Sequence, residues 1–111
     1  MFDSLYTNSF NFAVDKAANG ANTIYVVPDG KKIAVLDLFL QAEGDVEITL
    51  KSNATVLTGP INFTTATARE RRFTNNGAPV FKTIATGDDL VMFLSAGVQV
   101  NGYGIGVEVH S

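Results

Sequence analysis

The stretch Ile33-Ala34-Val35-Leu36-Asp37-Leu38-Phe39-Leu40 is apolar at every position except Asp37. Successive side chains of a β-strand point to opposite faces of the sheet, so a strand that is apolar at consecutive positions is covered on both faces. Residues 90–94, Leu-Val-Met-Phe-Leu, have the same character. Both segments therefore predict central strands covered, at least in part, on each side. A lone sandwich does not easily supply that much cover, so the pattern also points to a subunit interface.

Elsewhere the apolar residues recur with a period of two, which is the period of a β-strand with one buried face. The alternation is clear over residues 10–14, 46–51 and 103–109. Each pattern places one face of a strand against a core and the other in solvent or against a neighbour. In the last segment, glycines occupy one face, where missing side chains permit the close approach of another sheet or a neighbouring chain.

Turn-forming residues separate these runs at short intervals, as in Pro28-Asp29-Gly30, Glu43-Gly44-Asp45 and Gly87-Asp88-Asp89. Short strands spaced in this way predict an all-β fold, an antiparallel, jelly-roll-like β-sandwich. Residues 15–19, with Gly20 as a stop, are the single candidate for helix and are too short to matter alone. We expect a sandwich domain over residues 23–111. Residues 1–22 are either its first strand or an arm that docks on a partner.

Length and composition limit the classes of protein that this chain can be. It has 111 residues, 46% of them hydrophobic and 17% charged, which fits one folded domain and excludes intrinsic disorder. It has no cysteine, so disulfides and thiolate chemistry are excluded. A net charge of −3 argues against nucleic-acid binding, and no apolar run is long enough for a membrane span. Its first residues lack the pattern of a signal peptide, so we expect a protein used without secretion.

Two groups of residues are candidate partner contacts. Arg69, Arg71 and Arg72 form the one dense positive cluster, which suits either an acidic protein surface or a charged strand edge that prevents sheet-to-sheet aggregation. The second group is the aromatic and aliphatic start of the chain, Phe2, Leu5 and Tyr6, which needs a surface to pack on.

Other chemical motifs are weak. Glu43, Asp45 and Glu47 share a strand face but fall short of a calcium loop in ligand number, and acids at a turn are usually turn formers. The single histidine, His110, is the penultimate residue, where nothing fixes a catalytic geometry. Gly102-Tyr103-Gly104-Ile105-Gly106 cannot open the helix that a dinucleotide site requires. We therefore expect a protein that is not an enzyme and has no metal and no cofactor.

The order of several segments resembles small β-sandwich virion proteins of tailed bacteriophages and prophages, some of which are capsid decoration (cement) proteins. The segments that carry the likeness are residues 27–36, 46–52, 55–60, 86–90, 94–102 and 103–109. Together they cover most of residues 23–109. This chain has Thr74-Asn75-Asn76-Gly77-Ala78-Pro79 where similar proteins often carry Asn-Pro-x-Gly-Trp, and it contains no tryptophan.

The resemblance implies a structural protein of the virion that is made in the host cytoplasm and binds the capsid surface as a homotrimer. Its partners are then copies of itself and the major capsid protein or another virion protein, with neither nucleic acid nor membrane. The alternative is a carbohydrate- or receptor-binding module of a tail fibre or adhesin. Such modules often stack sugars on exposed aromatic rings, and the tyrosines available here are Tyr6, Tyr25 and Tyr103.

Overall fold

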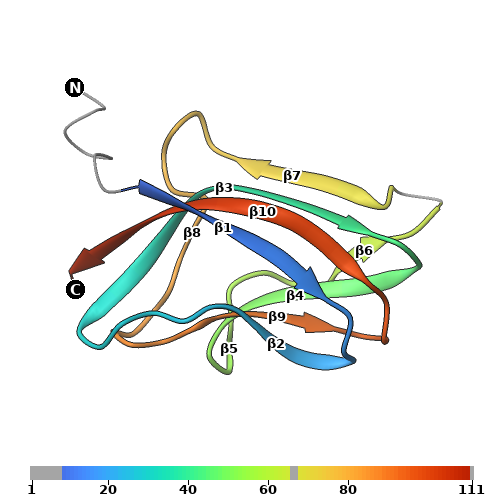
Figure 1. Cartoon of the computed structure of the whole chain (residues 1–111), viewed down its shortest axis with the longest axis horizontal. Helices are drawn as coiled ribbons and strands as arrows, with labels where there is room; N and C mark the ends of the chain where they lie inside the picture. The colour runs from blue at the N-terminus through green and yellow to red at the C-terminus, as the bar shows by residue number, and fades with distance from the viewer. Residues whose placement is uncertain (1–8, 66–67, 111) are drawn as a thin grey trace.

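The computed structural model describes residues 9–65 and 68–110, and within them it consists of two antiparallel β-sheets packed face to face (Figure 1). Sheet A has the strand order β1-β10-β3-β7, with β8 also pairing with β3, and sheet B has the order β2-β9-β4-β5, with β6 also pairing with β4. No helix in these residues could cross a membrane. The strands are β1 (Ser9–Lys16), β2 (Gly20–Tyr25), β3 (Lys31–Ala42), β4 (Val46–Ser52), β5 (Thr55–Val56), β6 (Ile61–Phe63), β7 (Glu70–Thr74), β8 (Phe81–Lys82), β9 (Leu90–Leu94) and β10 (Val100–His110).

The strands pair in a nested order that defines the topology. The first strand pairs with the last, β1 with β10, and the second pairs with the next to last, β2 with β9. Further inside the chain, β3 pairs with β7 and β8, and β4 pairs with β5 and β6. This is a long antiparallel hairpin folded into two sheets, which is the arrangement of a jelly roll. The predicted all-β sandwich is thus confirmed.

The two segments predicted as central strands lie in the middle of their sheets. The strand β3 lies between β10 and β7, and β9 lies between β2 and β4. The core between the sheets consists of Phe63 and of aliphatic side chains from both strands and their neighbours, including Leu38, Leu40, Leu50, Met92 and Leu94, each fully buried. The central position of β3 and β9 in their sheets therefore explains in part why both strands are apolar at successive positions.

Residues 15–19 are not helical. Asp15 and Lys16 complete β1, where they pair with Asn101 and Val100 of β10. The ladder to β10 satisfies their backbone groups, and a helix of one turn has no comparable cooperative gain. The strand β2 runs across the boundary expected between residues 22 and 23, so Ser9–Lys16 and Gly20–Tyr25 are both strands of the sandwich. The candidate contacts Phe2, Leu5 and Tyr6 lie outside the described residues.

Between residues 102 and 106 the glycines of β10, rather than its large apolar side chains, face the core, whereas Val100 at the start of the strand is buried in it. A Cβ at Gly104 would lie 2.2 Å from Cζ of Phe12, and one at Gly106 would lie 2.9 Å from Cδ1 of the buried Ile33. Phe12 stands directly across the ladder from Gly104, and its ring also packs near Tyr25 of sheet B. The aromatic ring therefore fills the inner space that a side chain on β10 would occupy. Tyr103, Ile105 and Val107 consequently lie on the outer face of sheet A.

This close packing predicts a graded response to added methyl groups. Gly104→Ala should destabilise the fold by about 1–3 kcal/mol through overpacking, because the Phe12 ring must move away. Gly102→Ala should cost more, since its Cβ would lie 1.8 Å from the backbone carbonyl oxygen of Phe39, which cannot rotate aside. Gly59→Ala is the control, because no atom lies within 4 Å of its added methyl. Urea denaturation of each variant gives the free energies of unfolding.

A second substitution separates the steric cause from a backbone effect. If the ring of Phe12 is the obstacle, Phe12→Leu should cost less in the Gly104→Ala background than in the wild type. Additive costs would show that the Phe12 ring is not what excludes a side chain at residue 104.

Candidate functional site

The three arginines of the predicted cluster point in three directions. Arg69, just before β7, donates from Nε and Nη2 to Oδ1 of Asp45, at 3.1 and 2.7 Å. Arg72 lies on the outer face of sheet A and holds Asp37 with two hydrogen bonds, Nε to Oδ1 at 3.2 Å and Nη2 to Oδ2 at 2.7 Å. The guanidinium of Arg71, which alternates with Arg72 along β7, is 5.9 Å from the ring centroid of the buried Phe63. The sequence cluster is therefore not one positive patch.

The two ion pairs differ in how far they are shielded from water. The side chain of Asp37 is 13% exposed and that of Asp45 is 58% exposed. Hydrogen bonding to Asp37 raises the pKa of the Arg72 guanidinium, and the hydrogen bond from Arg69 lowers the pKa of the Asp45 carboxyl. The strand β7 lies at the edge of sheet A, where charged side chains discourage pairing with another sheet. Arg69 and Arg72 are thus committed to partners within the chain.

An aromatic pair sits beside the Arg72–Asp37 ion pair on the outer face of sheet A. Tyr103 of β10 stands across from Phe39 of β3, and Phe39 stands across from Arg72 of β7. The rings of Tyr103 and Phe39 stack at a centroid distance of 5.6 Å, and Tyr103 is 45% exposed. Stacked aromatic rings next to arginine are characteristic of the centres of protein interfaces.

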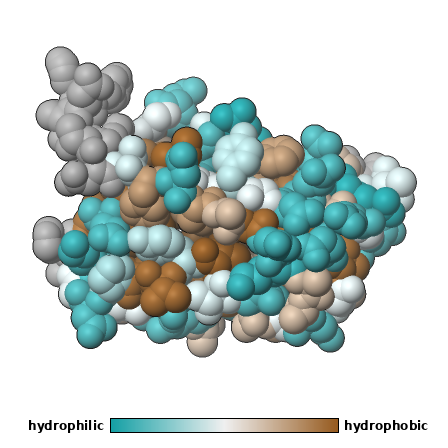
Figure 2. All heavy atoms as spheres, viewed as in Figure 1, coloured by the Kyte–Doolittle hydropathy of each residue, from teal (hydrophilic) through white to brown (hydrophobic). Residues whose placement is uncertain are grey.

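The outer face stays apolar along both strands from this pair, although Ala34 and Val107 are buried and only Tyr103 is exposed. Ile105 and Val107 follow Tyr103 along β10, and Val107 stands across from Ala34 of β3. None of these side chains belongs to the cluster that fills the space between the sheets. We call the set Ala34, Phe39, Tyr103, Ile105 and Val107 the outer apolar band. Figure 2 shows hydrophobic residues at the surface among hydrophilic ones in one view of the molecule.

The acids considered for calcium do not converge. Asp45 is held by Arg69, and the carboxylate of Glu43 accepts a hydrogen bond from Asn101 Nδ2 at 3.1 Å on sheet A. The backbone N–H of Glu47 donates to Oγ of Ser95, which directly follows β9. In the part of the chain that the structure describes, no three acidic or histidine side chains are placed to hold a metal ion. His110 is the last residue of β10, and Gly102, Gly104 and Gly106 lie within that strand.

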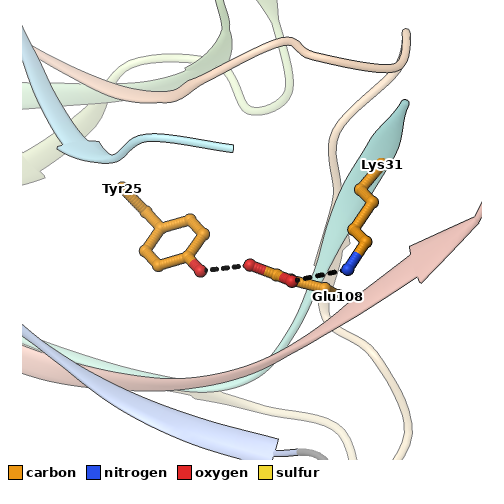
Figure 3. A network of polar contacts seen from close by, with 3 residues as sticks. All are labelled: Tyr25, Lys31 and Glu108. Carbon is orange, nitrogen blue, oxygen red and sulfur yellow. Dashed lines mark hydrogen bonds and ion pairs between the residues drawn. The ribbon is translucent and has the colours of Figure 1, made fainter. Parts of the chain in front are cut away.

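A polar network joins the two sheets near the C-terminal end of β10 (Figure 3). The carboxylate of Glu108 lies between the hydroxyl of Tyr25 and the ammonium of Lys31, so three strands, β10, β2 and β3, meet there. Tyr25 donates to Oε2 of Glu108 at 2.6 Å, and Lys31 Nζ donates to Oε1 at 3.3 Å. The ring of Tyr25 stacks on Phe10 at 4.8 Å, which fixes the position of its hydroxyl.

The pKa values of the groups in this network suit a structural contact between the sheets rather than acid–base catalysis. Burial and the hydrogen bond to Glu108 raise the pKa of Tyr25 to about 12. The hydrogen bonds from Tyr25 and Lys31 lower the pKa of Glu108. Both shifts move the groups away from neutral pH, whereas general acid–base catalysis needs a pKa near the working pH. The network therefore holds a neutral phenol and a carboxylate between the sheets.

A second network fixes the loops at one end of sheet B. Asp88 accepts hydrogen bonds from Ser52 Oγ at 2.8 Å and Asn53 Nδ2 at 2.9 Å. Asp89 Oδ1 accepts from the backbone N–H of Val27 at 3.0 Å. The Gly87-Asp88-Asp89 segment is thus a turn, as predicted, and it also ties together three loops that are distant in sequence.

Comparison with known proteins adds no family. No protein-family model matches this chain, and no curated protein matches it. The resemblance to phage virion proteins therefore stays a prediction.

Sequence reasoning missed both the outer apolar band and the Glu108 network. The outer apolar band exists because the glycine face of β10 is turned inward. A sequence in which glycine and apolar residues alternate does not say which of the two faces is buried. One signal was present: Phe10 and Phe12 alternate in β1 with enough aromatic volume to cover a strand of glycines. The network joins residues separated by up to 83 positions, and no local pattern encodes such a contact.

The Glu108 network predicts a loss of stability at both extremes of pH. The folded state holds the Tyr25 proton more tightly than the unfolded chain, so this contribution is present below pH 10 and is lost as pH rises from about 10 to about 12. For Glu108 the folded pKa is lowered, so its contribution is present above the ordinary value of 4.5 and is lost as pH falls through the folded pKa. Melting temperatures measured across pH by circular dichroism should show Tyr25→Phe flattening the alkaline limb and Glu108→Gln flattening the acid limb.

Phe10→Leu is the control for these pH profiles. It removes the ring stacked on Tyr25 but no titrating group, so it should lower the melting temperature at every pH without changing the shape of the curve. Profiles of Tyr25→Phe and Glu108→Gln that stay parallel to the wild type would contradict the assignment.

The two arginine ion pairs should differ in their effect on stability. Arg72→Ala leaves the shielded carboxylate of Asp37 without its partner and should lower the melting temperature measurably. Arg69→Ala removes an exposed pair with Asp45 and should leave the melting temperature close to that of the wild type. Differential scanning calorimetry of both variants tests this order, and an equal effect of the two substitutions would contradict it.

Proposed function

We propose that this protein is a structural component of a tailed-phage virion, a capsid decoration protein that associates with copies of itself and binds the head surface. Its partner there is the major capsid protein or another virion protein. The observation that carries the proposal is the outer apolar band, with its stacked Tyr103 and Phe39 beside Arg72. Tyrosine and arginine are enriched where proteins bind one another, and the interface centre is typically apolar.

The fold and the sequence resemblance support the same proposal. Double-sheet jelly rolls occur in viral capsid proteins and in lectins, so the fold fits both this function and its alternative. The likeness in segment order to phage virion proteins favours the capsid. Arg71 forms no ion pair within residues 9–65 and 68–110 and lies on the face of β7 opposite Arg72, so in this proposal it reaches an acidic group of the partner from the edge of sheet A, outside the outer apolar band. Phe2, Leu5 and Tyr6 stay predicted contacts of the same partner.

Binding to empty shells tests the proposal. Shells assembled from the major capsid protein of the same genome are mixed with the purified protein and pelleted by ultracentrifugation. The protein should co-pellet up to a fixed ratio per capsid subunit and should not bind double-stranded DNA in a gel-shift assay. Folded protein that stays in the supernatant at all concentrations would overturn the proposal.

A glycan-binding module is the second candidate, and the exposed ring of Tyr103 favours it. Asn101 and Gln41 stand across from one another on the same face, and amide side chains next to an aromatic ring are suited to sugar hydroxyls. A glycan array probed with the wild type and with Tyr103→Ser distinguishes the candidates. Binding of one glycan class that is lost in Tyr103→Ser supports this function, and an array without binding removes it.

A further inference from the structure

We propose that two copies of this chain bind each other through the outer face of sheet A, with the acidic end of one face against the lysine end of the other. The inference rests on the proposed function in that both use this face for protein binding. It adds the occupant and the relative orientation of the copies.

The outer face of sheet A has opposite charge at its two ends. At one end the ladder brings together Asp15 of β1, Asn101 of β10 and Glu70 of β7. At the other end Lys32 of β3 stands across from Val109, and Lys82 of β8 stands across from Ala34. Ile33 and Phe81 pack in or against the core, so their neighbours Lys32 and Lys82 lie on the opposite, outer face.

These charged groups are separated by the outer apolar band. From Asn101 to Val109 the strand β10 rises about 26 Å, which is more than twice the screening length of about 10 Å at 0.1 M salt. The two ends therefore act as separate charged sites. Among the described residues Glu70, Lys32 and Lys82 form no ion pair, so all three are available to a partner.

The middle of the face is close to neutral. Arg72 and Asp37 neutralise each other there, beside the stacked rings of Tyr103 and Phe39. An apolar centre between a negative and a positive end is complementary to the same face turned end for end. This self-complementarity is the property of an interface between identical subunits, and it is the reason to name a second copy rather than a foreign protein.

The charge distribution also limits the symmetry. A two-fold pair brings each acidic end to a lysine end, so both contacts form at once. The resemblance implies a cyclic trimer. In a trimer each acidic end can meet a lysine end only if the strands run perpendicular to the three-fold axis. Strands parallel to a common axis would instead gather the acidic ends, where like charges repel.

Complementary charge reversal tests the orientation. One variant carries Lys32→Glu and Lys82→Glu, so both ends of its face are acidic, and the other carries Asp15→Lys and Glu70→Lys, so both ends are basic. Each alone should self-associate at least about tenfold more weakly than the wild type in sedimentation equilibrium. An equimolar mixture should restore association, because every contact between unlike variants is then complementary.

Two further variants test the location of the contact. Tyr103→Ser removes the centre of the outer apolar band and should abolish association. Phe93→Ser, which removes an aromatic ring 37% exposed on sheet B, is the matched control and should have no effect on it. Circular dichroism confirms that each variant is folded before its mass is measured.

The outcomes separate this inference from the proposed function. A dimer or trimer that Tyr103→Ser dissociates and the mixed variants restore supports it. A monomeric wild type at 100 µM, or a mixture that fails to associate although both variants are folded, overturns it. A monomer that still co-pellets with shells overturns this inference but leaves the proposed function standing. An oligomer that does not co-pellet overturns the proposed function but leaves this inference standing.

Discussion

The close contact between β10 and its surroundings is the constraint on which the rest of the structure depends. The inner face of β10 has no room for side chains at residues 104 and 106, where Phe12 and Ile33 occupy the space. The ring that fills the space at residue 104 belongs to β1, so it joins the first and last strands of the part of the chain that the structure describes. That same pairing closes the nested topology, since β1 and β10 are its outermost pair. The contact between the Phe12 ring and Gly104 thus joins the outermost strand pair and leaves only the outer face of β10 for the side chains of Tyr103 and Ile105.

The strand β10 has the opposite orientation of side chains from that of a usual sandwich strand. A strand of a two-layer fold normally buries its large apolar side chains and exposes small or polar ones. In β10 the side chains of Tyr103, Ile105 and Val107 are turned outward, so sheet A is apolar on its inner face mainly through β3 and on its outer face through both β3 and β10. The exposed ring of Tyr103 in that outer band offers apolar surface to another protein. The proposed assembly role follows from this asymmetry between the faces of sheet A.

Polar groups then fix how the two sheets meet. Glu108 lies on the inner side of β10, where it is partly shielded, and an ionised carboxylate in such a place needs hydrogen bonds or an ion pair. Tyr25 and Lys31 provide both, one from sheet B and one from sheet A. Asp88 and Asp89 accept hydrogen bonds that fix the loops at the end of sheet B. A sandwich held by such directional contacts, in addition to its aliphatic core, presents its outer face as a rigid surface.

The sequence by itself determined the class of the fold, because the period of two and the turn residues act locally. It also indicated the two central strands, because residues 33–40 and 90–94 are apolar at successive positions, as is typical of strands in the middle of a sheet. It could not determine which face of β10 is buried, since Tyr103 and Gly104 satisfy an alternating pattern equally well in either orientation. It grouped Arg69, Arg71 and Arg72 by their spacing, although strand alternation and distant carboxylates separate them in space. Those features were decided by the tertiary structure, because the volume of Phe12 and the positions of Asp37, Asp45 and Tyr25 become known only when strands distant in sequence are paired.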